Sequence, residues 1–124
     1  MFFFADRKLE IVRVHLMRTG AWSLIAAIIV LSLVPTSLRP STRLPHDFEH
    51  AAIFMLTGFT FGMAYRIRHL CHIAGFIAFA GVTEAAQILI PGRHARVRDF
   101  VVDALSGAGG VLVSWLITNR RQRR

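Results

Sequence analysis

The sequence predicts an all-α integral membrane protein: a bundle of four transmembrane helices preceded by an amphipathic interfacial segment. Three observations predict this class. Hydrophobic residues make up 54% of the 124 residues, more than a water-soluble domain usually contains. They fall into four runs of roughly membrane-spanning length, and only helices satisfy their own backbone within lipid. Lys and Arg are also distributed unevenly among the segments that connect these runs.

The N-terminal segment, residues 1–19, carries Arg7, Lys8, Arg13 and Arg18 ahead of the first run. This arrangement resembles a signal peptide, but no small-x-small cleavage site follows residues 34–37. We expect a helix lying on the membrane surface, and the alternative is a frayed tail held by electrostatic attraction. The side chains expected to face the membrane are Phe2, Phe3, Phe4, Leu9, Val12 and Leu16.

The four runs define a transmembrane domain, residues 20–118, followed by a basic cytoplasmic tail, residues 119–124. A helix needs about 20 residues to cross the hydrocarbon, or as few as about 17. The second run is short, and it reaches this length when His50 and Arg66 are counted as its interfacial ends. The runs are residues 21–38 and 51–65 without a charge, 73–90 with only Glu84, and 100–118 with only Asp103.

The distribution of charge predicts a membrane protein with both termini in the cytoplasm. With four spans, ten Lys or Arg side chains lie on the side of the termini and five on the other side. The ten are Arg7, Lys8, Arg13, Arg18, Arg66, Arg68, Arg120, Arg121, Arg123 and Arg124, and the five are Arg39, Arg43, Arg93, Arg96 and Arg98. Topology and attraction to anionic membrane lipids therefore account for the net charge of +8, and no nucleic-acid partner is predicted.

Polar residues from three predicted helices converge on the outer side of this topology. Glu84 and Gln87 lie near the outer end of residues 73–90, Asp99 and Asp103 begin the last helix, and His50 begins the second. A carboxylate within a membrane span is costly unless it faces protein or water. Two neighbouring carboxylates, Glu84 and Asp103, cannot both ionise cheaply there unless Arg93 or His50 neutralises one.

Small residues predict the packing faces of these helices. A small and polar stripe in the last helix places both aspartates on its packed face, and it consists of Asp99, Asp103, Ser106, Gly110 and Ser114. The second helix contains Gly58-x-x-x-Gly62, which allows close contact within one chain or between chains. The motif is therefore compatible with a monomer and with a homo-oligomer.

Individual roles follow from the chemistry of each side chain. We expect Arg93 to pair with Glu84 or Asp99, with an outward reach to a phosphate or carboxylate as the alternative. His50 is expected to donate a hydrogen bond to Glu84, with proton transfer or metal ligation as the other readings. Asp47 is expected to cap the second helix after Pro45, and Gln87 to bond within the same network.

No cofactor is predicted. The segment containing His46, Glu49 and His50 matches the H-x-x-E-H zinc pattern, but its place at the mouth of a membrane helix makes coincidence the favoured reading. His69-Leu70-Cys71-His72 is expected in the short inner connection, and a single cysteine excludes an intramolecular disulfide.

The order of these motifs resembles the VanZ-like family, named for a teicoplanin-resistance protein. The resemblance covers about residues 46–115, and it comprises His50, Glu84-x-x-Gln87, Pro91-Gly92-Arg93, Asp99-x-x-x-Asp103 and Ser106 with Gly107 and Gly110. It implies a small multi-helix protein of the bacterial inner (cytoplasmic) membrane, linked in some members to low-level glycopeptide resistance. Family members usually have Asn and Gly where this chain has Asp103 and Ser106, and His46-Asp47 replaces a common Asp-Lys pair, so the predicted site is more acidic here.

Three functions are compatible with these residues. The first is a protein that binds membrane lipid, a lipid-linked cell-wall intermediate or a glycopeptide-related ligand. The second is a membrane enzyme acting on a lipid head group, for which the catalytic candidates are His50, Glu84 and Asp99. The third is a subunit or carrier in which the cluster serves as a structural brace. The predicted ligand-binding residues are His50, Glu84, Gln87, Arg93, Asp99 and Asp103.

Overall fold

The computed structural model describes residues 2–38 and 43–123, and these residues contain four α-helices and no strand. The all-α prediction is therefore confirmed. The helices are α1 (Phe2–Leu33), α2 (His46–Ala64), α3 (His69–Gln87) and α4 (Val97–Gln122), and the short 3-10 helix η1 (Thr36–Leu38) follows α1.

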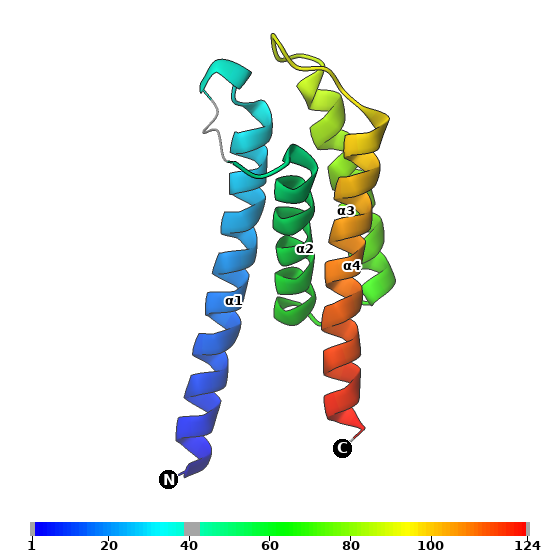
Figure 1. The fold of residues 1–124 in the computed structure, drawn as a ribbon. Helices are drawn as coiled ribbons and strands as arrows, with labels where there is room; N and C mark the ends of the chain where they lie inside the picture. Colours follow the sequence, from blue (N-terminus) through cyan, green and yellow to red (C-terminus); the bar gives the residue numbers. More distant parts are fainter. Residues whose placement is uncertain (1, 39–42, 124) are drawn as a thin grey trace.

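The helices alternate in direction, so that both ends of the chain lie at the same end of the bundle (Figure 1). In consequence α2 and α4 run in the same direction. α2 lies between α1 and α4 and packs against both, whereas α1 and α4 do not contact each other directly. α3 packs mainly on α4.

Three of the four helices, α1, α3 and α4, are long and apolar enough to cross a membrane. α2 does not meet this criterion, because its first two turns contain four ionisable side chains: His46, Asp47, Glu49 and His50. Only 17% of the membrane-length window in α1 and 22% of that in α3 are buried inside the protein. Most of their apolar surface therefore faces outward, where contact with lipid is more favourable than contact with water.

The ends of the helices differ from the predicted boundaries. α1 continues without a break through residue 19, so the predicted interfacial segment and the first predicted span form one helix. It ends at Leu33, two residues before Pro35, because proline disfavours helical backbone in the residue before it. α4 continues to Gln122, so most of the predicted tail is helical, and α3 begins at His69 rather than after His72. Arg39 and Arg124 of the charge count, and the side chains of Phe2, Phe3 and Phe4, lie outside the description.

α2 and α4 pack with their backbones in direct contact. A Cβ atom added to Gly58 would overlap the carbonyl oxygen of Gly107, and one added to Gly110 would overlap that of Met55. The next turn of α2 places Gly62 against the side chain of Ser114. The stripe of small residues predicted in the last helix is thus a packing face within the chain, and Gly58-x-x-x-Gly62 is the surface that it meets.

A core of aromatic residues lies just below the polar residues of α2. Phe54 is 1% exposed, and its ring centroid lies 5.8 Å from that of Phe79 of α3 and 6.5 Å from that of His50. Phe76, Ala104 and Val111 complete this core from α3 and α4. His50 therefore marks the boundary between the apolar interior and the polar end of the bundle.

The contact between α2 and α4 predicts the effect of adding one methyl group. Gly58→Ala should lower the free energy of unfolding by about 1–3 kcal/mol, because the new carbon meets backbone that cannot move aside. Gly75→Ala is the matched control in α3, where an added Cβ meets nothing within 4 Å and better helix propensity should stabilise slightly. Unfolding by SDS titration, followed by circular dichroism, measures both; equal midpoints would contradict the packing.

Candidate functional site

Two His–Asp pairs join α2 to α4 at the polar end of the bundle. Since these helices run in the same direction, two histidines four residues apart on α2 face two aspartates four residues apart on α4. His50 Nδ1 lies 3.0 and 3.2 Å from the two carboxylate oxygens of Asp103, and His46 Nε2 lies 4.0 Å from Asp99 Oδ2. The two imidazole centroids are 4.3 Å apart and the ring planes are tilted by 52°, so the two pairs are in contact with each other.

The buried pair of His50 and Asp103 fixes the orientation of the imidazole. The carboxylate accepts the proton on Nδ1, which leaves Nε2 as the second functional atom of the ring. Nε2 has no hydrogen-bond partner among the described residues. The same arrangement of carboxylate and imidazole orients histidines in binding sites and in proton transfer.

Glu84 reaches from α3 to the first turn of α4. Its Oε1 accepts the backbone N–H of Arg96 at 2.5 Å, and Arg96 is the N-cap residue of α4, which no side chain of its own caps. The carboxylate thus satisfies one of the unpaired N–H groups at this helix end and lies at the positive end of its dipole. This contact explains why a carboxylate is tolerated in a helix of membrane length.

The second carboxylate oxygen of Glu84 lacks a partner among the described residues. Glu84 is 7% exposed, and its Oε2 is buried with no hydrogen-bond partner among the residues described. Buried polar groups in proteins almost always have a partner, so this oxygen indicates a position for a ligand or water. Gln87, one turn further along α3, is 5% exposed.

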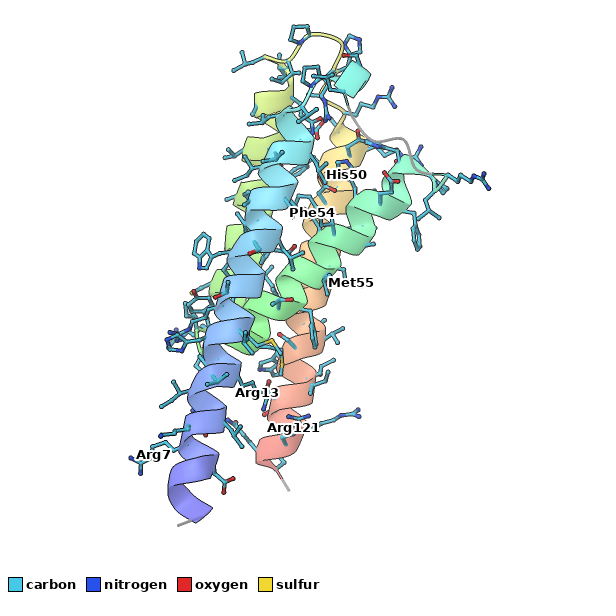
Figure 2. All side chains as sticks on the ribbon, turned by 90° about the vertical axis from the view of Figure 1, so that its left-hand side faces the viewer. Arg7, Arg13, His50, Phe54, Met55 and Arg121 are labelled. Carbon is cyan, nitrogen blue, oxygen red and sulfur yellow. The ribbon has the colours of Figure 1, made fainter. Side chains whose placement is uncertain are left out.

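Glu84 lies within electrostatic range of Asp99, Asp103 and His50. Three helices therefore contribute to one buried cluster: α2 through His50, α3 through Glu84, and α4 through Asp99 and Asp103. We call these four residues the polar cluster. Figure 2 shows His50 at the end of the bundle opposite Arg7, Arg13 and Arg121.

Arg93 connects the α3–α4 loop to the end of α1. The turn Ile90-Pro91-Gly92-Arg93 closes with a hydrogen bond of 3.1 Å from Arg93 N–H to the Ile90 carbonyl, and Gly92 has a φ of 80°. Proline followed by a glycine with positive φ is the pattern of a type II β-turn. The guanidinium then donates to the carbonyl oxygens of Leu31 (2.7 Å) and Val34 (2.9 and 3.2 Å), which the C-terminal turn of α1 leaves without amide partners.

Several predicted partners differ from those observed. His50 bonds to Asp103 and not to Glu84, because the contact between α2 and α4 is closer than that between α2 and α3. Asp47 does not cap α2: the N-cap is Pro45, and Asp47 forms an exposed ion pair with Arg98. The guanidinium of Arg93 donates to carbonyl oxygens at the end of α1. The role of His46 beside Asp99 was missed, although the matching four-residue spacings on the two helices contain that signal.

The zinc pattern is not realised as a metal site. Within residues 2–38 and 43–123, no group of three or more His, Cys, Asp or Glu side chains could hold a metal ion. His46 and His50 instead face Asp99 and Asp103 of α4.

The fold and the polar cluster define a small all-helical protein with membrane-length helices and a buried group of carboxylates and histidine at one end. Comparisons with protein-family models, curated proteins and solved structures find no match for the chain.

The pair of His50 and Asp103 predicts strong coupling between two substitutions. His50→Ala should lower the free energy of unfolding by about 3 kcal/mol, because it leaves the Asp103 carboxylate buried without its donor. Adding Asp103→Ala should cost less than the sum of the two single changes, with a coupling energy of about 0.5–3 kcal/mol. SDS unfolding of the wild type, the two single variants and the double variant measures this coupling energy. Strictly additive losses of stability would argue against the pair.

Arg93 predicts a different effect from its neighbour Arg96. Arg93→Ala removes the donors to the end of α1 and should lower stability by about 1.5–3 kcal/mol. Arg96→Ala should change it by less than about 0.5 kcal/mol, since Arg96 is exposed and contacts Glu84 through its backbone. Thermal unfolding in detergent distinguishes the two, and a larger loss for Arg96→Ala would refute the assignment.

Proposed function

We propose that this chain is a four-span protein of the bacterial cytoplasmic membrane whose polar cluster binds the head group of a lipid-linked or other cell-envelope ligand in the outer leaflet. The observation that carries the proposal is the buried Oε2 of Glu84, a carboxylate oxygen without a partner among the described residues. It lies in a cluster of carboxylates contributed by α3 and α4, next to His50 of α2.

The length of α2 supports a fourth span. Its 19 residues extend about 28 Å at 1.5 Å per residue, close to the hydrocarbon thickness of about 30 Å. Its ionisable side chains lie in its first two turns, at the membrane boundary. The labelled Arg7, Arg13 and Arg121 lie at the opposite end (Figure 2), so the positive-inside rule places the polar cluster on the outer side.

The charges of the cluster favour a ligand that brings hydrogen-bond donors. Glu84, Asp99 and Asp103 supply carboxylate oxygens, which only accept hydrogen bonds when ionised. Arg93 already donates to α1, and the exposed Arg98 pairs with Asp47. A head group with hydroxyl or amino groups, such as a sugar or an amine, therefore fits the cluster better than a bare phosphate.

The resemblance to the VanZ-like family supports this ligand class. We propose that the chain is related to that family through Glu84-x-x-Gln87, the Pro91-Gly92-Arg93 turn and Asp99. A contribution to teicoplanin resistance follows as a phenotype to be measured when the chain is expressed in a susceptible host.

Head-group chemistry is the second candidate function, and the pair of His50 and Asp103 favours it. A carboxylate that holds Nδ1 makes Nε2 a general base, and Glu84 is within electrostatic range to act as the second acid–base group. Asp99 is instead positioned beside His46. In this case a bound head group would be converted and not only retained.

Ligand binding is tested with Glu84→Gln, which preserves the acceptor for Arg96 N–H and removes the buried charge. We expect the wild-type protein, purified in mild detergent, to carry a lipid-linked species in native mass spectra. The occupancy of Glu84→Gln by this species should be at least about tenfold lower than that of the wild type. Asp47→Asn is the matched control, because it removes a carboxylate at the same end that pairs with Arg98 in an exposed position.

Three outcomes separate the candidates. Equal lipid occupancy in wild type, Glu84→Gln and Asp47→Asn, with a lower unfolding midpoint for Glu84→Gln alone, would make the cluster a structural brace. Selective loss in Glu84→Gln supports binding. Conversion of the retained lipid by wild type but not by His50→Asn, with the lipid still bound, would establish the enzyme.

A further inference from the structure

A second polar space lies at the other end of the bundle, near the two termini. α2 ends at Ala64, while α1 and α4 extend beyond it without touching each other (Figure 1). Between them lies a cavity of about 390 Å³, lined by residues of α1, α2, α3, α4 and the α2–α3 loop. No residue of the polar cluster lines this cavity.

The lining of this cavity is strongly basic. Four arginines and two histidines contribute to it: Arg13, Arg18, Arg66, Arg121, His69 and His72. Glu10 is the one acid in the lining, so the net charge is +3 with both histidines neutral. An excess of cations around a concave space attracts an anion.

None of the four arginines has an acidic partner among the residues that the structure describes, and three of them form no hydrogen bond or ring contact there either. Arg18 is engaged: it donates to the Ala64 carbonyl at 3.5 Å, and its guanidinium lies 4.9 Å from the centroid of the Tyr65 ring. Arg13, Arg66 and Arg121 are exposed and form no ion pair in the described part of the chain. Their donors are therefore available to a bound group.

The N-terminus of α3 opens on the same cavity. His69, its first residue, lines the cavity, and no side chain caps this helix. The unpaired N–H groups and the positive end of the helix dipole add to the attraction of the arginines for negative charge.

Aromatic side chains place the cavity at the depth of the membrane interface. Tyr65 and Trp115 line it; Trp22 Nε1 donates to the Tyr65 hydroxyl at 2.8 Å, and the His69 and Trp115 rings lie 4.9 Å apart. Tyrosine and tryptophan concentrate where lipid head groups meet the hydrocarbon.

We propose that this cavity binds the phosphate of an anionic lipid head group in the leaflet on the side of the two termini. Arginine binds phosphate through two parallel N–H donors, and basic pockets between membrane helices on the cytoplasmic side bind anionic head groups. The aromatic residues hold the glycerol and acyl portions at the interface. The site is independent of the polar cluster and of its proposed ligand.

The experiment titrates phosphatidylglycerol into the full chain in dodecyl maltoside and follows tryptophan fluorescence. Both tryptophans report on the cavity, since Trp115 lines it and Trp22 bonds to Tyr65. We expect saturable binding, with one lipid retained in native mass spectra, and no saturation with phosphatidylcholine. Arg121→Gln and Arg66→Gln should each weaken binding at least about fivefold, and Arg66→Lys should restore part of the loss.

Arg120→Gln and Arg7→Gln are the matched controls, because they remove the same charge at the same end of the bundle but do not line the cavity. Both should bind within twofold of wild type. Equal losses of lipid affinity in the variants that line the cavity and in the controls would show a general attraction of lipid to this basic end of the bundle, and would overturn the site. Saturation by inorganic phosphate with no lipid site would overturn the lipid as the source of the phosphate. Circular dichroism confirms that each variant is folded.

Discussion

The direct backbone contact between α2 and α4 is the constraint on which the polar end of the molecule depends. Gly58 lies against the carbonyl of Gly107, and Gly110 lies against that of Met55, so the two parallel helices have one register. That register places His50 opposite Asp103. A side chain larger than glycine at these positions would separate the helices, and the hydrogen-bonding distance of 3.0 Å between the imidazole and the carboxylate would be lost.

The loop between α3 and α4 is held at both of its ends by charged groups bonded to backbone. Glu84 accepts the N–H of Arg96 where α4 begins, and Arg93 donates to carbonyls where α1 ends. Each contact satisfies backbone groups that a helix terminus leaves unpaired, and each places the charge at the favourable end of a helix dipole. The type II turn at Gly92 makes both contacts compatible, because it reverses the chain within four residues.

Periodicity and composition predicted the helices and the end at which the polar residues gather, because both depend on local spacing. Pairings across helices depend on register, which spacing alone does not determine. His50 was assigned to Glu84, and Arg93 to a carboxylate, since opposite charges are the usual partners within a membrane. In the structure His50 instead forms a hydrogen bond with Asp103, and Arg93 donates to carbonyl oxygens at the end of α1. The length of α1 was also predicted wrongly. The basic residues near its N-terminus suggested a boundary after residue 19, but the helix continues through that position to Leu33.

The polarity of α2 explains why this helix falls below the mean hydropathy of a membrane span. Hydropathy counts His50 and Asp47 as though they faced lipid. In the structure the imidazole is buried against Asp103, and Asp47 pairs with Arg98 at the exposed helix start, so neither group meets hydrocarbon alone. α2 is flanked by α1 and α4, which cover part of its surface. A helix packed between two neighbours can carry ionisable residues at one end, provided that its neighbours supply their partners.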